Sequence, residues 1–344
     1  MELAIAPYRL RFIHPFGTAH GLREGTDSVF IRLSQGAVHG YGEATLPPYL
    51  DYLQKSVIQE ITDFWLNQSI GSLSMPFAAN WDGGLCPPAR AAIQMAYMSL
   101  TVNQLAVCGE SDAGSSVKPV SMVTLGHSDL RDIPLKIAQL PMSGALKVKL
   151  GATNDLDVLR AVADLDGRKL FLDANQGWTN MGQAAAAVAA VGAERVLGLE
   201  QPFAKDRWDL HRELKEHLDL PVYGDESIQG LADLERAGEA FDGVNLKLMK
   251  CGGLDVAAQM ARRGQELGLK VMLGSMSESS LGCAAMASLG GMADLLDLDG
   301  PWLISNDPFQ GLRMERGRLM VDGTTGFGVE LRADHGLQFT PIGT

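Results

Sequence analysis

The sequence has little positive charge for its length. Its 344 residues contain 29 Lys and Arg against 41 Asp and Glu, which gives a formal net charge of −12 at pH 7. Nucleic acids and anionic membrane surfaces attract proteins that carry an excess of positive charge. The composition therefore predicts neither a nucleic-acid partner nor a membrane partner.

Cysteine is also scarce. The chain contains four cysteines, none in a Cys-x-x-Cys pair: Cys86, Cys108, Cys251 and Cys283. Disulfide frameworks and zinc sites depend on paired or closely spaced cysteines. We therefore predict buried free thiols.

Long apolar runs are missing as well. No uninterrupted apolar stretch is long enough to span a bilayer, and the N-terminus lacks a basic region followed by an apolar run. We expect a cytoplasmic protein without a signal peptide. The sequence leaves the oligomeric state open, and a homo-oligomer is compatible with it.

The N-terminal section predicts an α+β domain over residues 1–115. Residues 2–12, 28–34 and 37–43 have the short apolar pattern of strands, and residues 51–70 and 87–107 have a helical pattern. The stretch between the first two strands, Thr18 to Gly25, predicts a loop from which His20 and Arg23 reach a ligand; a solvated turn is the alternative. Residues 109–118 are small and polar and predict a linker.

After the linker, short apolar runs alternate with helical segments. Eight runs end in or near polar residues, and seven of these, from Lys149 to Asp297, are spaced by 24, 27, 25, 22, 28 and 22 residues. A strand–helix repeat of this length is a βα unit, and eight in series predict a (β/α)8-type barrel over residues 116–317. A doubly wound open sheet is the alternative. Residues 318–344 are expected to return to the first domain.

Three carboxylates end consecutive barrel strands: Asp173, Glu200 and Asp225. The C-terminal strand ends of a parallel barrel meet at one mouth, so these side chains should converge there. Converging carboxylates need a neutralising cation, and an all-oxygen set without His or Cys suits Mg2+. A single such Asp is more often a helix cap or a surface group. Of Asp225 and Glu226 only one can face inward, and we assign Asp225.

Two lysines flank this carboxylate set. Lys149 ends the second strand and Lys247 the sixth, four strands apart and thus across the barrel. This placement suits removal of a proton from one face of a carbon and its return to the other. The alternative is that each lysine only pairs with a nearby carboxylate. Lys250 is a poorer candidate, because it is expected to lie beyond the strand.

The eighth strand adds Asp297 and Asp299, which share one face and lie across the barrel from the fourth strand. A ligand that reaches from the metal to this strand would carry a carboxylate at one end and a cation, such as an ammonium group, at the other. Capping of the following loop by Asp299 is the alternative.

Taken together, these stretches resemble the muconate-lactonizing subgroup of the enolase superfamily. The matching segments are Lys147-Val-Lys149, Asp173-Ala-Asn-Gln-Gly-Trp178, Glu200-Gln-Pro, Gly224-Asp-Glu-Ser227, Asn245-Leu-Lys247 with its sequel to Gly253, and Gly274-Ser-Met-Ser-Glu278. The Asp297-Leu-Asp299 pair resembles the dipeptide epimerases of that subgroup, in which such a pair holds the substrate α-ammonium. The resemblance implies a modified (β/α)7β barrel with an α+β capping domain.

The resemblance also implies a function. Asp173, Glu200 and Asp225 would be ligands of one Mg2+, Lys149 and Lys247 the acid/base pair, and Lys147 a holder of the substrate carboxylate. The enzyme would epimerise a dipeptide at the α-carbon of its C-terminal residue through an enediolate that Mg2+ stabilises. An o-succinylbenzoate synthase, a cycloisomerase or a non-catalytic metal-stabilised binding protein are the alternatives.

The substrate side chain is less well defined. Relatives that recognise glutamate carry an arginine after a Pro-Phe-x-Thr-Ala segment, but here Arg23 is displaced from the expected position. An L-Ala-D/L-Glu substrate and one with an uncharged side chain both remain open. Ser275 and Met276 are expected to line the substrate pocket with His20 and Arg23, and Tyr49 and Tyr52 are candidates to line it from the cap.

Overall fold

The computed structural model describes residues 1–344 apart from 19–20, 68–83, 108–120, 127–128, 324 and 344. The predicted linker 109–118, His20 and Cys108 therefore lie outside the described residues. Cys86, Cys251 and Cys283 are free thiols, of which Cys283 is buried and the other two are half-buried. Within the described ranges, no helix is long and apolar enough to cross a membrane.

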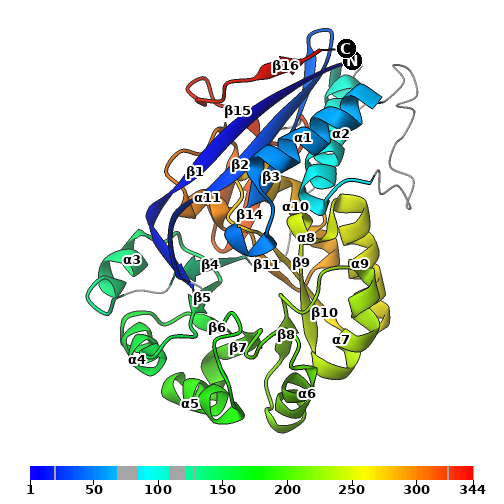
Figure 1. Cartoon of the computed structure of the whole chain (residues 1–344). Coiled ribbons are helices and arrows are strands. Elements are labelled where there is room, and N and C mark those ends of the chain that lie inside the picture. Colours follow the sequence, from blue (N-terminus) through cyan, green and yellow to red (C-terminus); the bar gives the residue numbers. More distant parts are fainter. Residues whose placement is uncertain (19–20, 68–83, 108–120, 127–128, 324, 344) are drawn as a thin grey trace.

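The N-terminal part forms a cap whose sheet has the order β16-β1-β2-β3. The cap lies above the barrel in Figure 1, with both termini at its top. The elements of the cap are β1 (Glu2–Thr18), β2 (Gly21–Gln35), β3 (Val38–Leu46), η1 (Pro48–Leu50), α1 (Gln54–Asn67) and α2 (Pro87–Val107).

The first hairpin is longer than predicted. β1 and β2 stay paired as far as Thr18 and Gly21, so Arg23 lies in β2, opposite Phe16, rather than in a loop. The loop prediction for Thr18 to Gly25 was wrong because the backbone ladder resumes beyond a bulge that follows Arg11.

Helix α2 packs closely on β3 because both elements have small residues at their contact. A Cβ atom at Gly42 would lie 1.9 Å from the carbonyl oxygen of Ala92, and one at Gly40 would lie 2.1 Å from that of Ala96. Neither distance is sterically allowed, so glycine at these positions lets the helix backbone approach the strand. The alanines of α2 provide the matching flat face.

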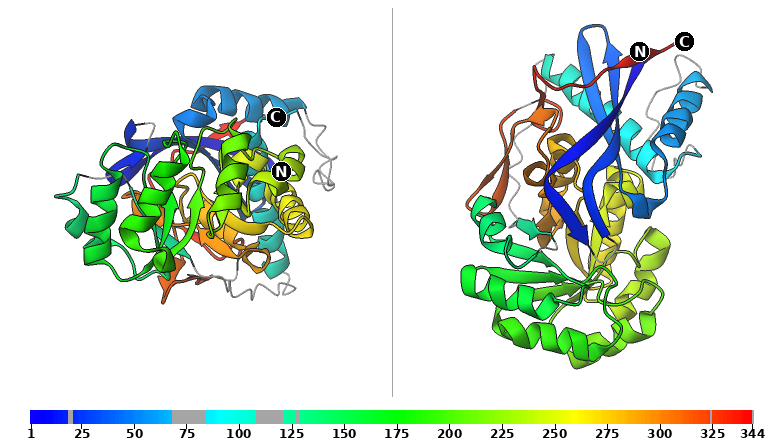
Figure 2. Two further views of the ribbon diagram at one scale, coloured as in Figure 1. Left: turned by 90° about the horizontal axis from the view of Figure 1, so that it is seen from below. Right: turned by 60° about the vertical axis from the view of Figure 1, so that its left-hand side comes forward.

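The second part is an eight-stranded parallel barrel, which confirms the predicted fold. Figure 2 shows the strands enclosed by helices, seen from below in its left view. The strands are β4 (Met122–Leu125), β5 (Ala145–Lys149), β6 (Lys169–Asp173), β7 (Val196–Glu200), β8 (Val222–Gly224), β9 (Gly243–Lys247), β10 (Lys270–Gly274) and β11 (Leu295–Asp297). The helices between them are α3 (Ile133–Gln139), α4 (Asp155–Leu165), α5 (Met181–Val191), α6 (Trp208–His217), α7 (Leu234–Ala240), α8 (Leu248–Cys251), α9 (Leu254–Glu266) and α10 (Ser280–Ala287), with short 3-10 turns η2 (Ala193–Arg195), η3 (Leu231–Asp233) and η4 (Gly290–Met292).

The barrel closes between its last and first strands. A single bridge joins Ser121 to Leu296, and the backbone N–H of Thr124 donates to the Asp299 carboxylate. The end of β4 therefore lies beside the segment that follows β11.

Side-chain alternation divides the barrel interior into an apolar floor and a polar mouth. Met122, Ala145, Phe171, Tyr223 and Met272 form a buried apolar cluster inside the barrel. On the same inward face, Asp173 lies two residues beyond Phe171 of β6, and Asp225 lies two residues beyond Tyr223 of β8. This period of two places the polar strand ends directly above a dry core.

The C-terminal segment passes from the barrel back to the cap. It contains α11 (Gly300–Leu303), β12 (Phe309–Gln310), β13 (Leu312–Glu315), β14 (Arg318–Val321), β15 (Glu330–Leu331) and β16 (Thr340–Ile342). β16 pairs with β1, and the Phe309 ring packs against Phe30 and Tyr41 of the cap sheet. The division into domains 1–115 with 318–344 and 116–317 stays a prediction, and its second boundary falls inside the β13–β14 hairpin.

Buried polar contacts fix the cap on the barrel. Arg90 of α2 forms an ion pair with Asp255 of α9 at 2.7 Å. Glu43 of β3 is fully buried and accepts hydrogen bonds from the backbone and hydroxyl of Ser279, at the start of α10. These contacts hold the cap over the barrel mouth.

Candidate active site

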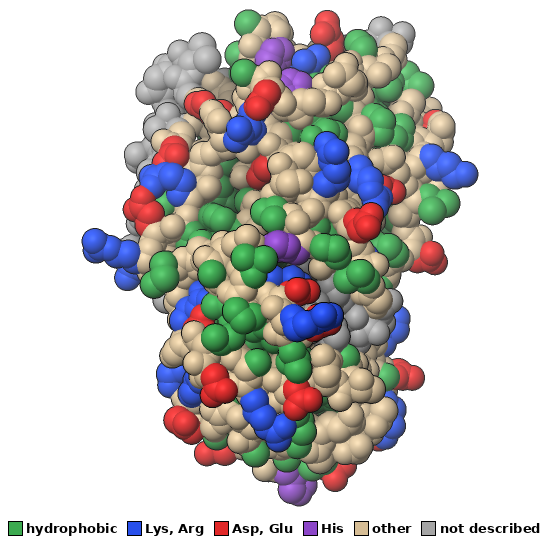
Figure 3. Space-filling model, turned by 90° about the vertical axis from the view of Figure 1, so that its left-hand side faces the viewer, with side chains coloured by type: hydrophobic (Ala, Val, Ile, Leu, Met, Phe, Trp, Pro, Cys, Tyr) green, Lys and Arg blue, Asp and Glu red, His purple; other side chains and the backbone are tan. Residues whose placement is uncertain are grey.

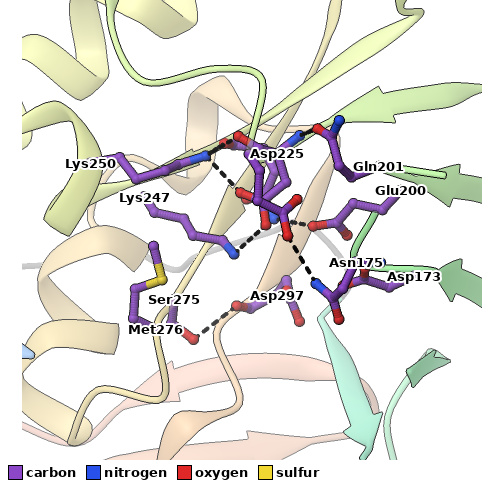
Figure 4. Close-up of polar contacts among 12 residues, drawn as sticks. Asp173, Asn175, Glu200, Gln201, Asp225, Lys247, Lys250, Ser275, Met276 and Asp297 are labelled. Carbon is purple, nitrogen blue, oxygen red and sulfur yellow. Dashed lines mark hydrogen bonds and ion pairs between the residues drawn. The ribbon is translucent and has the colours of Figure 1, made fainter. Parts of the chain in front are cut away.

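The polar strand ends surround a cavity between the barrel mouth and the cap. It contains about 550 Å³ of empty space including its open side. Its lining residues are Arg23, Tyr49, Thr124, Lys149, Asn175, Asp225, Glu226, Lys247, Ser275, Met276, Ser277, Asp297, Asp299 and Leu303. Figure 4 shows how several of them point toward one another.

Lys149 and Lys247 reach this cavity from opposite walls. Lys149 ends β5 and donates to Asp173 at 2.6 Å, and Lys247 ends β9 and donates to Asp225 at 2.7 Å. β5 and β9 are separated by three strands on one side of the barrel, so the two ammonium groups face each other across it. Both side chains are almost fully buried.

Lys147 lies deeper than the cavity, among three carboxylates. Its ammonium group is 2.6 Å from Asp297, 2.7 Å from Glu200 and 3.0 Å from Asp173. Burial alone would lower the pKa of Lys147, but the three negative charges outweigh burial and raise the pKa well above its usual range. The ammonium group therefore acts as the central cation of the cluster.

The carboxylates of the mouth differ in their pKa values. Burial opposes ionisation of all of them, but the ammonium groups of Lys147 and Lys149 lower the pKa of Asp173, and those of Lys247 and Lys250 lower that of Asp225. Glu200 has a pKa raised to about 8, because burial and the Asp173 charge outweigh the attraction of Lys147. Glu200 is thus the carboxylate that most needs a further positive charge to stay ionised.

The donor set fits a hard cation. The Lys147 ammonium lies 3.0 Å from Asp173 and 2.7 Å from Glu200 and serves there as a stand-in cation. Asn245 Oδ1 and Asp297 Oδ1 are buried oxygens that lack a hydrogen-bond donor. Such oxygen donors are the ligands that Mg2+ prefers. Within the described residues no three acidic, His or Cys side chains are already gathered as a ligand set. Lysine ammonium groups are instead paired with the carboxylates of the mouth.

Asp297 and Asp299 line the cavity on the side of β11 and β4. Asp297 accepts from Lys147 through Oδ2, while its Oδ1 is buried without a donor. Asp299 accepts from the Thr124 backbone, and burial together with the Asp297 charge raises the pKa of Asp299 to about 7. Two adjacent carboxylates of this kind form a site for a cationic group.

The cap contributes Arg23 and Tyr49. The Arg23 guanidinium lies over the rings of Phe12, at 5.4 Å, and Tyr49, at 5.7 Å, and donates to Thr26 at 3.1 Å. Tyr49 donates its hydroxyl to the Met276 sulfur at 2.8 Å. Tyr52 instead lines an adjoining cavity, which shares Tyr49, Glu226 and Met276 with the first.

Comparison with known proteins agrees with this architecture. Residues 139–335 match the family described as Enolase C-terminal domain-like. The chain is 31% identical over 335 residues to an L-Ala-D/L-Glu epimerase of Bacteroides thetaiotaomicron, covering 96% of this chain and 88% of the relative. The chain belongs to the enolase superfamily.

Two further superfamily members illustrate the range of relatives. A hydrophobic dipeptide epimerase of Roseobacter litoralis is 30% identical, with 91% of this chain and 94% of the relative covered. The solved dipeptide epimerase of Methylococcus capsulatus, complexed with Mg and L-Arg-D-Lys, is 26% identical with a TM-score of 0.79 and covers 96% of this chain and 99% of that one.

Ser275 and Met276, which follow β10, both line the cavity of this superfamily member. Ser275 donates its hydroxyl to the backbone oxygen of Asp297 at 3.2 Å, so it links the ends of β10 and β11. Met276 is anchored through its backbone N–H to Glu278 and through its sulfur to Tyr49. Their role in substrate binding stays a prediction, as do the roles of the other residues assigned from the sequence; His20 lies outside the described residues.

The structure adds residues that the sequence did not single out. Lys250, dismissed as lying beyond the strand, donates to Asp225 Oδ1 at 2.6 Å from helix α8. Asn245 lies two residues before Lys247 on the same inward face of β9 and donates to Glu200 at 2.8 Å. Glu226, which accepts from Asn175, lines the cavity together with Asp225, so the expectation that only one of the two faces inward was wrong. The inward period of two in β9 could have identified Asn245, whereas nothing local identifies Lys250.

Proposed function

We propose that the protein is an isomerase that epimerises dipeptides at the α-carbon of the C-terminal residue by 1,1-proton transfer. The observation that carries this proposal is the placement of Lys149 and Lys247 on opposite walls of one cavity, each beside a carboxylate. A substrate carbon held between them would be accessible to a base on one face and to an acid on the other. The similarity to epimerases supports the same reaction.

Asp173, Glu200 and Asp225 would hold one Mg2+ in this proposal. The burial of all three carboxylates at the barrel mouth and the Mg in a related solved structure support that assignment. When bound, Mg2+ supplies positive charge that stabilises the negative charge developing beside the substrate carboxylate and disfavours ammonium groups nearby. Lys147 would hold the same substrate carboxylate from below.

The proton transfer would proceed through the two lysines. One lysine in its neutral form removes the α-proton, and the other, protonated, donates a proton to the opposite face of the carbanion. In the reverse direction the two exchange roles, so one site serves both epimers. Lys149 and Lys247 are almost fully buried, which limits access of water to the carbanion.

Recognition of a free α-ammonium distinguishes this proposal from other superfamily reactions. Asp297 and Asp299 would hold the ammonium of the N-terminal residue. The substrates of o-succinylbenzoate synthases and cycloisomerases carry no ammonium group, so Asp297 and Asp299 would have no cationic substrate group to hold. The presence of both lysines in the cavity argues against a non-catalytic binding protein.

Arg23, with Tyr49 and Met276, would contact the side chain of the C-terminal residue. The half-buried guanidinium of Arg23 favours an acidic side chain, such as that of an L-Ala-D/L-Glu substrate, while its aromatic neighbours Phe12 and Tyr49 also suit an uncharged one. The test should therefore include dipeptides with an acidic and with an uncharged C-terminal side chain.

A dipeptide library incubated in D2O with Mg2+ and read by mass spectrometry tests the proposal. We expect one deuterium per turned-over molecule, located at the C-terminal α-carbon, and the appearance of the second epimer. Absence of exchange with every dipeptide would rule out the reaction. The same library reports which side chains are accepted.

A further inference from the structure

A second cavity adjoins the site on the side where the α-ammonium would be held. It contains about 500 Å³ of empty space including its open side. Its lining includes Ile13, Thr124, Leu125, Lys136, Trp302 and Leu303. Two of them, Thr124 and Leu303, also line the first cavity, so the two spaces meet at these residues.

The end of β4 and the segment after β11 contribute residues to both cavities. Thr124 lies beside Asp299, to which its backbone N–H donates, and the next residue, Leu125, lines only the second cavity. On the other side, Asp299 lines the first cavity, and Trp302 of α11, whose backbone N–H donates to the Asp299 carbonyl at 2.9 Å, lines only the second. A group bound at Asp299 therefore lies beside the entrance to the second cavity.

Strand β1 of the cap contributes the outer wall of this second cavity, which keeps an open side. β1 descends from the cap to the barrel in Figure 1, and its His14 is hydrogen bonded to Gln139 of α3. Figure 3 views this side of the molecule and shows hydrophobic side chains at the level where cap and barrel meet. Ile13, on β1, is 52% exposed and forms part of the rim.

Most of the wall is apolar. Ile13, Leu125, Leu140, Trp302 and Leu303 present hydrocarbon to the space, and Lys136 adds a positive charge. Burial of an apolar group here is favourable, because each buried methylene contributes to binding. A cationic side chain would instead be repelled by Lys136.

We infer that the second cavity binds the side chain of the N-terminal residue and selects dipeptides with a large apolar residue at that position. The inference rests on the proposed function, in which Asp297 and Asp299 hold the α-ammonium. The ammonium and the side chain of an amino acid are attached to the same carbon. A side chain that leaves this carbon beside Thr124 and Leu303 enters the second cavity.

Matched dipeptides test the inference. We compare L-Leu-L-Leu with L-Ala-L-Leu, and L-Leu-L-Glu with L-Ala-L-Glu, so that only the N-terminal residue changes within a pair. The wild-type protein should prefer N-terminal leucine by about 10- to 100-fold in kcat/KM, as expected for three additional buried carbons. L-Lys-L-Leu should be at least about tenfold poorer than L-Leu-L-Leu.

A variant that fills the cavity gives the structural control. Ile13→Trp adds bulk at a half-exposed position of the rim, so the fold should tolerate it. It should lower kcat/KM for L-Leu-L-Leu by about tenfold or more and leave L-Ala-L-Leu within about twofold. Leu66→Trp, an equally exposed position on α1, should change neither value. Equal preference for both N-terminal residues in the wild type, or an equal loss for both in Ile13→Trp, would overturn the inference.

Calorimetric binding with Mg2+ separates this inference from the proposed reaction. If no dipeptide exchanges deuterium, the proposed function fails. Tighter binding of L-Leu-L-Leu than of L-Ala-L-Leu by about tenfold would still support the cavity assignment. Equal affinities, or no binding of either peptide, would overturn it.

Discussion

Lys247 and Lys250 donate hydrogen bonds to the two oxygens of one carboxylate, that of Asp225. The distances are 2.7 Å to Oδ2 and 2.6 Å to Oδ1, and all three side chains are buried. Lys250 also donates to the backbone oxygens of Asp225 and Asn245. It therefore fixes the position of Asp225 from the outer side and leaves Lys247 on the side of the cavity.

We expect Lys250→Met to destabilise the protein without Mg2+ by about 3–5 kcal/mol, because it breaks a buried ion pair. The surplus negative charge at Asp225 should then favour a divalent cation. Addition of Mg2+ should consequently raise Tm more in the variant than in the wild type. Differential scanning calorimetry with and without Mg2+ measures both effects.

Lys270→Met is the matched control, because Lys270 is exposed at the start of β10, at the opposite end of the barrel. It should show the wild-type response to Mg2+. A Mg2+-dependent rise in Tm that is equal to or smaller than that of the wild type in Lys250→Met would contradict the assignment of Asp225 as a metal ligand.

Variants that lack one of the two cavity lysines should differ in which epimer still exchanges its α-proton. Lys149→Ala and Lys247→Ala should each lower the rate of epimerisation by about 10²–10⁴-fold, since each removes an acid/base group. Each variant should still exchange the α-proton of only one of the two epimers, the one whose proton faces the remaining lysine. Proton NMR in D2O on the separate epimers measures this exchange.

Lys270→Ala serves as the control and should retain both exchanges. A single-lysine variant that exchanges both epimers at the wild-type rate would contradict the two-base arrangement.

Asp297→Asn should weaken binding of dipeptides with a free ammonium. Loss of a charge-assisted hydrogen bond of about 1.5–3 kcal/mol corresponds to a rise in KM of roughly 10- to 100-fold. The preference of the wild type for a free over an N-acetylated dipeptide should shrink by the same factor. Steady-state kinetics on both peptides, with circular dichroism to verify folding, measures the change; unchanged KM would favour the cycloisomerase alternative.

His211 should make the fold sensitive to acid. It is fully buried on α6; its Nδ1 donates to the Arg207 carbonyl and its Nε2 accepts from the Phe203 N–H, so the ring is neutral. Burial lowers its pKa to about 4. Between pH 6.5 and about 4 the unfolded chain therefore binds a proton that the folded chain does not, and up to about 3 kcal/mol of stability is lost as the pH falls through this window.

Urea denaturation at pH 7.5 and 4.5 measures this loss. His211→Gln should flatten the pH dependence by a comparable amount, whatever its stability at neutral pH. His217→Gln, at an exposed position on the same helix, should keep the wild-type slope. An unchanged slope in His211→Gln would show that other groups control the acid sensitivity.

Much of the architecture was predictable because it depends on local pattern. Apolar runs of four to six residues at a spacing of 22–28 residues predicted the barrel strands, and their polar ends predicted which residues meet at the mouth. Asp173, Glu200, Asp225, Lys149 and Lys247 do meet there. Parallel strands enforce this convergence, so the spacing alone was sufficient.

Contacts between distant segments were not predictable. Lys250 reaches Asp225 only because α8 turns back immediately after β9, and Arg23 stacks on Tyr49 only because the long β1–β2 hairpin extends down to the mouth. Lys147 lies on the same face as Lys149, but its deep position depends on an ion pair with Asp297 of β11, which is distant in sequence.

The sequence by itself determined the strand–helix repeat and the chemical character of each strand end, because a period of two residues fixes which side chains point inward. Only the tertiary structure decided which charges pair, how deeply they are buried and how the cap divides the space above them. Those properties depend on closure of the barrel between β11 and β4 and on the seating of the cap through Glu43 and Arg90. Such long-range packing has no counterpart in local sequence periodicity.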